Sequence, residues 1–306
     1  MSVTRSTGEM AIRTVRLTKM YGSSRGILDL DLEVRQGEIF GFLGPNGAGK
    51  TTTIRLLLDL IKPTSGSARV LGLDCVRDSV AVRRLVGYLP GEVSLYEWMT
   101  GVALLDFLAR AGNRPAPLRG ELLERLDLDP SGRIGRFSHG MKQKLALVSA
   151  MQHDPAVLLL DEPTSGLDPL IQQEFYVILR DLKNRGRTIF LSSHVLAEVE
   201  RLCDRVGIIR EGRLVAVEEV GTLRNRVIRE MRVTFAVPID ARLLEGPGVR
   251  VVSANGCEVR LSVAGGVGDL VRRLAEHEVA DLEYDKPSLE ALFLGYYSER
   301  EGHSGV

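Results

Sequence analysis

The first two thirds of the chain combine two kinds of apolar pattern. Residues 27–34 alternate apolar and polar side chains, as a half-buried strand does. Residues 157–161 form an apolar strand with acidic residues at its end, and residues 188–192 form a second buried strand. Between them, residues 169–184 predict a long helix, with Gly186 as its stop signal. This alternation predicts an α/β fold with a mainly parallel sheet and helices on both faces.

The pattern changes after Leu223, which predicts one domain at residues 1–222 and a smaller one at residues 223–306. Two domains fit the length of 306 residues. The second domain predicts the order β-α-β-β-α-β, the split βαβ arrangement of a small α+β domain. Its expected strands are 231–237, 249–253, 257–263 and 279–284, and its expected helices are 219–230, 240–244, 267–277 and 288–297.

Composition narrows the class of protein. The 40 basic and 40 acidic residues give a net charge of zero, which argues against a primary nucleic-acid binder. No apolar run approaches the roughly 20 residues that span a bilayer, and the first twelve residues are too polar for a signal peptide. We therefore expect a cytoplasmic protein that needs a partner for any role in a membrane. The three cysteines are far apart and form no metal or disulfide pattern.

A glycine-rich loop carries the strongest chemical signal. It matches G-x-x-x-x-G-K-[ST] in full, after a strand expected at 38–43 and at the start of a helix expected at 49–60. In this context the backbone N–H groups cradle phosphates, the lysine reaches the β- and γ-phosphates, and the threonine hydroxyl binds Mg²⁺. The loop residues are Gly44, Pro45, Asn46, Gly47, Ala48, Gly49, Lys50 and Thr51.

Two adjacent acids end the apolar strand at 157–161. Neighbouring side chains on a strand point to opposite faces, so Asp161 and Glu162 are expected to do different work. Asp161 is predicted to hold Mg²⁺, directly or through water. Glu162 is predicted to act as the general base on the attacking water. A catalytic role for Lys50, Glu162 and one further residue, His194, follows from the resemblance below.

Three further segments distinguish this chain from kinases, GTPases and motors. Residues 137–144 (FSHGMKQK) begin a helix, residues 165–168 (SGLD) follow the acidic strand, and residues 191–194 (LSSH) end the next strand. With the phosphate loop, residues 10–220 resemble the ATP-binding subunits of ABC transporters. The resemblance implies a P-loop NTPase of ABC type, with antiparallel N-terminal strands and a helical subdomain at about 90–150. A small α+β domain completes the chain.

The resemblance also assigns individual residues. It implies that His194 contacts the γ-phosphate and orients the water, and that Tyr21 stacks on adenine. It places Asp168 in a loop that communicates across a dimer interface. Further nucleotide-binding positions are Thr52, in the phosphate loop, and Ser138, His139, Gly140 and Met141, which would bind the ATP held by the other subunit.

Two positions depart from the family pattern. The usual signature LSGGQ is FSHGM here, so His139 replaces a glycine and Met141 a glutamine, while Ser138 and Gly140 remain. The family also has a Mg²⁺-binding glutamine after a strand like 86–90, where this chain has Gly91 and Glu92. Glu92 could supply a metal oxygen, or it could face the transmembrane partner. The register favours the second reading, because Gly91 occupies the glutamine position.

These features predict an ATPase that uses ATP and Mg²⁺ to drive export by a separate transmembrane permease. Residues 285–294 (DKPSLEALFL) resemble the tail of bacterial efflux-type subunits for drugs, antibiotics or lipids. The subunit would work as a homodimer, or as a heterodimer with a related subunit, at the cytoplasmic face of the membrane. The alternative is a soluble ABC ATPase acting on ribosomes or nucleic acid. A single phosphate loop and the lack of a coiled-coil pattern favour transport.

Overall fold

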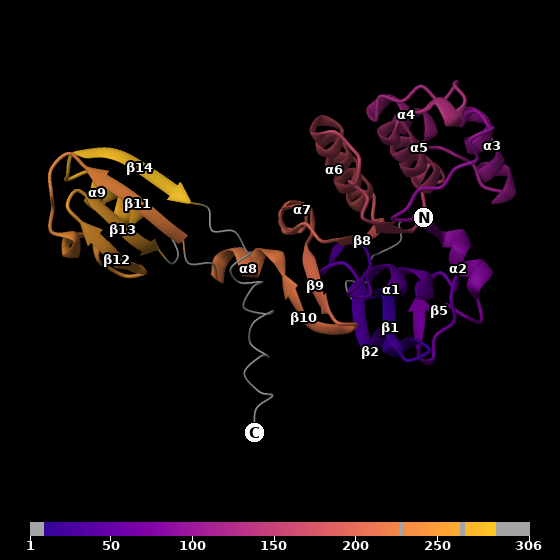
Figure 1. The fold of residues 1–306 in the computed structure, drawn as a ribbon, viewed down its shortest axis with the longest axis horizontal. Coiled ribbons are helices and arrows are strands. Elements are labelled where there is room, and N and C mark those ends of the chain that lie inside the picture. The colour runs from indigo at the N-terminus through magenta and orange to yellow at the C-terminus, as the bar shows by residue number, and fades with distance from the viewer. Residues whose placement is uncertain (1–8, 227–228, 264–266, 286–306) are drawn as a thin grey trace, which may run out of the picture. The chain divides into compact units, whose positions relative to one another are not determined.

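A computed structural model describes residues 9–226, 229–263 and 267–285 (Figure 1). Contacts divide the chain into two compact units, Met1–Glu218 and Glu219–Val306, and each unit is described by itself. None of the described helices is long and apolar enough to cross a membrane.

The central sheet of the first unit has six strands in the order β10-β9-β3-β8-β7-β6. Strand β3 runs parallel to β8 and β9, and β7 runs parallel to β8 and β6. In this register Leu43 pairs with Ser193 and Asp161 with Ser192, so the carboxyl ends of three strands meet at one edge. The strands are β3 (Ile39–Leu43), β6 (Val86–Leu89), β7 (Val157–Asp161), β8 (Thr188–Ser193), β9 (Arg205–Arg210) and β10 (Arg213–Glu219).

A four-stranded sheet of order β2-β1-β4-β5 adds the N-terminal antiparallel layer, with the long pair β1 and β2 as its largest part. Strand β2 alternates buried apolar and exposed polar side chains from Leu30 to Arg35, as expected where one face covers a core, whereas β1 has a register shift between Thr14 and Leu17 that interrupts the alternation. Its strands are β1 (Met10–Tyr21), β2 (Ser24–Arg35), β4 (Ser65–Val70) and β5 (Leu73–Asp74).

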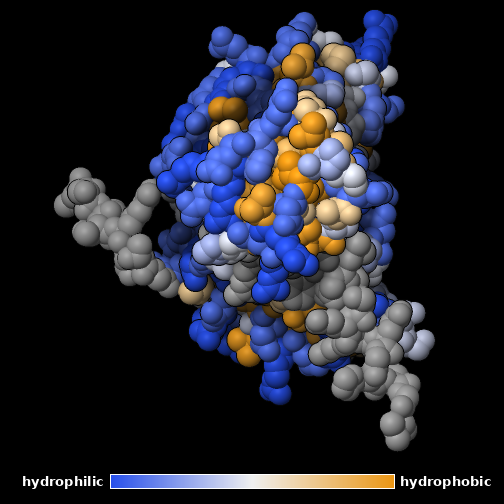
Figure 2. Space-filling model, turned by 90° about the vertical axis from the view of Figure 1, so that its left-hand side faces the viewer, coloured by the Kyte–Doolittle hydropathy of each residue, from blue (hydrophilic) through white to orange (hydrophobic). Residues whose placement is uncertain are grey.

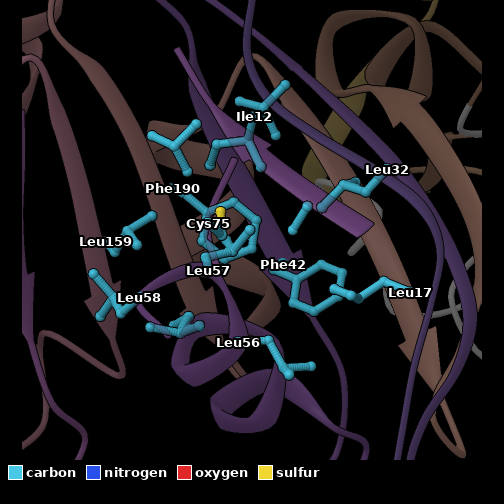
Figure 3. Packing of buried hydrophobic residues seen from close by; sticks show 14 of the residues in the cluster. Ile12, Leu17, Leu32, Phe42, Leu56, Leu57, Leu58, Cys75, Leu159 and Phe190 are labelled. Atoms are coloured by element: carbon cyan, nitrogen blue, oxygen red, sulfur yellow. The ribbon is translucent and has the colours of Figure 1, made fainter. Parts of the chain in front are cut away.

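The main core lies between these two sheets and helix α1 (Lys50–Leu57) (Figure 3). Phe40 and Phe190 stack there with ring centroids 5.9 Å apart. On the other face of β3, a side chain at Gly41 would lie 2.9 Å from Cys203 Sγ, at the end of α7 (Leu196–Leu202). Helices therefore cover both faces of the central sheet, and the predicted fold class is confirmed. Helix α1 ends before the predicted residue 60, because Asp59 adopts a left-handed φ of 55° that no helix continues.

The helical subdomain lies between β6 and β7 in the sequence. Figure 1 shows α3, α4 and α5 grouped together beside α6. Arg125 joins α4 to α6, with its guanidinium 2.6 Å from a Glu174 oxygen and 2.9 Å from an Asp181 oxygen. The helices are α2 (Ser79–Leu85), which precedes β6, then α3 (Gly101–Ala111), α4 (Arg119–Arg125), the 3-10 turn η1 (Ile134–Arg136), α5 (His139–Met151) and, after β7, α6 (Pro169–Asn184).

The second unit contains a four-stranded antiparallel sheet of order β12-β13-β11-β14. This is the order of a split βαβ domain, as predicted, although its first helix is the 3-10 turn η2, which Asp240 caps by accepting a hydrogen bond from Arg242 N. Val233, Phe235 and Leu261 anchor its own core. Figure 2 shows apolar side chains exposed among polar ones on the face that it draws. The helix expected at 288–297 lies outside the described residues. The elements are α8 (Val220–Arg226), β11 (Arg229–Phe235), η2 (Ala241–Leu244), β12 (Val249–Asn255), β13 (Glu258–Val263), α9 (Gly268–Leu274) and β14 (Val279–Asp285).

Candidate nucleotide site

The phosphate loop, residues 44–49, connects the buried end of β3 to the first turn of α1. Gly49 stands at the N-cap of α1 with φ 110°, and no side chain caps the helix. A side chain at Gly49 would lie 2.6 Å from Ile27 Cγ2 and 2.9 Å from Gly26 O, so only glycine lets the loop approach β2 this closely. The uncapped N–H groups of α1 therefore remain available to an anion.

Lys50 is buried at the start of α1, with only 6% of its side chain exposed. Its ammonium group donates to Gly44 O at 2.6 Å and to Pro45 O at 3.2 Å. It also lies 3.2 Å from Glu162 Oε1, a buried oxygen without a hydrogen-bond partner among the described residues. The loop carbonyls thus hold a positive charge directly beside the predicted general base.

The two carboxylates at the end of β7 face different partners. Asp161 accepts hydrogen bonds from Thr51 Oγ1 at 2.7 Å and from Ser192 Oγ at 2.5 Å. Glu162 has a left-handed φ of 48°, which turns the chain out of the strand immediately after Asp161. Its backbone N–H donates to Ser192 Oγ at 3.1 Å. Strain at such a position persists only when neighbouring contacts hold it, and Ser192 supplies those contacts here.

His194 follows β8 and lies beside Glu162. Its Nδ1 is 2.9 Å from Glu162 Oε2, and more than half of the side chain is exposed. One oxygen of the Glu162 carboxylate contacts Lys50 and the other contacts His194, so the three side chains form one line of contacts. A carboxylate held in this way can polarise a water molecule that reaches it from the solvent.

An open pocket lies over the loop and extends to the turn between β1 and β2. Tyr21 lines it with about half of its side chain exposed, and Lys19 Nζ lies 5.3 Å from the centre of the tyrosine ring. Sequence reasoning missed Arg25 and Gly26, which also line the pocket. Arg25 is held by Glu211, whose Oε2 is 3.1 Å away. The β1–β2 hairpin could have indicated these two residues, because it pairs Tyr21 with Ser24, directly before Arg25.

The signature residues lie elsewhere. Within the described part of the chain, the pocket is lined by Tyr21, Arg25, Gly26, most of residues 45–52 and Glu162, and its lining contains no signature residue. Ser138 caps α5 by accepting a hydrogen bond from Met141 N at 3.2 Å, and Asp168 caps α6 through Leu170 N and Ile171 N. Ser138, His139 and Asp168 are exposed, while Gly140 and Met141 are partly buried.

Gly91, where the resemblance predicts a glutamine, adjoins the end of the sheet that carries Asp161. A side chain added at Gly91 would begin 3.2 Å from Asp161 Oδ2, whereas Glu92 is exposed. Burial and the nearby negative charge of Asp161 raise the pKa of Tyr88, three residues earlier on β6. The oxygens of Thr51 and Asp161 suit a hard cation such as Mg²⁺.

Comparison with known proteins places these features in a family. A family model described as ABC transporter matches residues 27–165. The bacitracin transport ATP-binding protein BcrA of Bacillus licheniformis is 44% identical over 219 residues, covering 70% of this chain and 72% of its own. The daunorubicin resistance ATP-binding protein DrrA3 of Streptomyces coeruleorubidus is 34% identical and covers 94% of this chain and 95% of its own.

Solved structures give the same result. One described as the ATP-binding subunit of an ABC transporter is 31% identical, with a TM-score of 0.66, and covers 70% of this chain and 92% of its own. The dimeric bacterial ABC transporter cassette MJ0796 is 21% identical and shares the fold, with a TM-score of 0.63 over 68% of this chain and 98% of its own. The phosphate loop, the paired acids and these relatives together show that the chain belongs to the ABC transporter family, as an ATP-binding and ATP-hydrolysing subunit.

Proposed function

We propose that this subunit binds Mg·ATP over residues 44–52 and hydrolyses it with Glu162 as general base. The observation that carries the proposal is the line of contacts from Lys50 through Glu162 to His194. Lys50 would leave its loop carbonyls for the β- and γ-phosphates. Tyr21 would stack on the adenine, at the far end of the same pocket. Each of these roles belongs to a residue that lines the pocket or contacts Glu162.

Mg²⁺, when bound, would neutralise charge on the β- and γ-phosphates. Thr51 and Asp161 are the residues that would hold it, because both already present oxygens to one point. Ser192 keeps the Asp161 carboxylate in place. Glu162 would take a proton from the attacking water. His194, which contacts Glu162 Oε2, would help to orient that water. General-base assistance of this kind contributes typically about 10²- to 10⁴-fold to a rate.

A second copy of the subunit, or a related one, would complete each site. Ser138 and the N-terminus of α5 are exposed and lie outside the pocket of their own chain. Ser138, His139, Gly140 and Met141 would therefore bind the γ-phosphate of ATP held by the partner, with backbone N–H groups as donors. Asp168 would lie at the same interface, since it begins α6 on the exposed side.

A transmembrane permease would dock on the helical subdomain. Trp98 is 76% exposed. The Tyr96 ring packs at a tilt against Trp98 and edge-on against Phe107. Exposed aromatic clusters of this kind mark interaction surfaces. Exposed Glu92 would pair with a basic residue of the same partner.

Export is the direction of transport that the relatives support. BcrA is named for bacitracin transport and DrrA3 for daunorubicin resistance. The permease would hold this subunit at the cytoplasmic face of the membrane and would select the substrate. The unit after Glu218 would have an accessory role, regulating the ATPase or supporting the dimer, because its described residues include no phosphate-binding loop. None of the relatives compared supports action on ribosomes.

The permease assignment is tested with Glu92→Ala in the assembled transporter, after the membrane subunit that co-purifies with the chain has been identified. We expect near-normal ATPase activity of the isolated subunit and weakened stimulation by transported substrate. Glu92→Gln serves as the matched control for size. An equal loss in both assays that raised Mg²⁺ repairs would instead identify Glu92 as a metal ligand and reject the permease role.

A further inference from the structure

His139 is the residue by which the signature departs most from the family pattern, and its imidazole does not lie free. A side chain added at Gly166 would begin 2.4 Å from both Cδ2 and Nε2 of His139. No real contact is that short, so the imidazole edge occupies the space that any residue other than glycine would need. Gly166 has φ 76°, a conformation that also favours glycine. A side chain added at the next signature residue, Gly140, would begin 3.1 Å from Gly166 O, a tight contact.

Gly166 belongs to a short loop, residues 162–168, with a functional residue at each end. Glu162, the proposed general base, begins the loop, and Asp168, which caps α6, ends it. Two turns hold its shape, with Ser165 N bonded to Glu162 O at 3.2 Å and Leu167 N bonded to Thr164 O at 3.1 Å. A displacement of Gly166 therefore reaches both ends of the loop.

Helix α5 holds this loop at a second point. Gln143 lies one helical turn after His139, on the same face of α5. Its buried amide donates to Pro163 O at 3.0 Å, directly after Glu162. His139 and Gln143 thus form a two-point contact, defined here as the clamp, from the signature helix onto residues 163 and 166.

We propose that His139 is a positioning residue whose side chain fixes the loop of residues 162–168 against α5. Its backbone N–H stays available to the partner's ATP, while its imidazole sets the position of Glu162 for the ATP bound by its own chain. The clamp would make one rigid unit of two half-sites, the signature that serves the partner's nucleotide and the base that serves the chain's own. The inference rests on the proposed roles of Glu162 and the signature.

The test compares four full-length variants, His139→Ala, His139→Gln, Gly166→Ala and the double variant His139→Ala with Gly166→Ala, by steady-state ATPase kinetics. We expect His139→Ala to lower kcat about tenfold, the scale of a small misplacement of a catalytic group, with KM for ATP nearly unchanged. His139→Gln retains a planar polar side chain of similar length and should recover most of kcat. Thermal unfolding of each variant shows whether the protein remains folded.

The double variant shows whether the two single substitutions act through the contact between His139 and position 166. Gly166→Ala should be more damaging than His139→Ala, because the new methyl group meets the imidazole. Removing that imidazole should return part of the lost activity, so the double variant should exceed Gly166→Ala alone. Losses that simply multiply would overturn the proposal. So would a His139→Ala variant with raised KM and normal kcat, which indicates a phosphate ligand, or one with wild-type kinetics.

Should Gly166→Ala not fold, the kcat and KM of His139→Ala and His139→Gln decide alone. A Glu162→Gln variant distinguishes failure of the proposed function from failure of the clamp. Wild-type turnover by Glu162→Gln rejects the proposed function itself. An inactive Glu162→Gln together with a pure KM effect of His139→Ala rejects only the clamp.

Discussion

The two halves of the ATP machinery in this chain are built differently. The phosphate-loop half is recessed and bonded within itself, with Lys50, Thr51, Asp161, Glu162 and Ser192 in mutual contact. The signature half is exposed, and within the part of the chain that the structure describes the Ser138 hydroxyl bonds only to its own helix. A half-site that satisfies its charges internally can exist before ligand arrives. A half-site made of an exposed helix N-terminus, capped only by its own Ser138, suits a ligand from outside, such as the ATP held by a second subunit.

The largest expected effect removes the base from the internally bonded half. Glu162→Gln keeps size and hydrogen-bonding ability but cannot accept the proton, so we expect hydrolysis at least about 100-fold slower. ATP binding should persist, because Lys50 and the loop remain. The variant should then accumulate as an ATP-bound dimer, visible by size-exclusion chromatography with ATP. Wild-type turnover would remove Glu162 from the mechanism.

A smaller effect concerns the cation. Thr51→Ala removes one of the two oxygens that meet at the proposed Mg²⁺ position while leaving Asp161 bonded to Ser192. We expect the Mg²⁺ concentration for half-maximal activity to rise about tenfold, which corresponds to a loss of roughly 1.4 kcal/mol in the free energy of Mg²⁺ binding. Thr51→Ser is the matched control and should stay near wild type. An unchanged Mg²⁺ requirement in Thr51→Ala would place the cation elsewhere.

The smallest effect tests the helical subdomain, away from both half-sites. Burial, and next the charge of Arg114, lower the pKa of His153 from 6.5 to about 4. The folded protein therefore keeps this residue neutral while the unfolded chain takes up a proton as the pH falls below about 6.5. Stability should decline between about pH 6.5 and pH 4, by on the order of 1 to 2 kcal/mol after allowance for partial exposure.

His153→Gln should remove this part of the pH dependence. The measurement is the urea midpoint of the wild type and the variant at pH 7.5 and pH 5. An equal change of the urea midpoint between pH 7.5 and pH 5 in both proteins would show that the fold does not lower the pKa of His153. The ATP site should respond to neither change, which separates this region from the two half-sites.

The comparison of the two halves also shows what sequence could predict. The phosphate loop and the acids of β7 were readable because one strand and one loop carry them in contiguous order. Ser192 was not assigned, because its bond to Asp161 depends on the register between β7 and β8. Arg25 and Gly26 reach the pocket only through the β1–β2 hairpin. The left-handed turn at Glu162 also left no trace in residue type, since such turns usually favour glycine or asparagine.

The signature half was predicted from the family pattern rather than from local chemistry. Ser138 as the N-cap of α5 and Asp168 as the N-cap of α6 fit ordinary helix starts. The contact between His139 and Gly166 joins residues from separate segments, and spacing alone does not reveal it. The split βαβ order of the second unit was readable from alternating strands, whereas its first helix is shortened to a 3-10 turn.

The central claim is that each ATP needs Lys50 of one subunit and Ser138 of the other, and mixing two inactive variants tests it most directly. Lys50→Ala and Ser138→Arg should each lack activity alone, because each spoils both sites of a homodimer. In a mixed dimer one site combines both defects and the other has none. Equal amounts that assort at random should recover about a quarter of the wild-type rate, since half the dimers are mixed and each holds one intact site. Activity of Ser138→Arg by itself, or no recovery on mixing when exchange of subunits is verified, would contradict the claim.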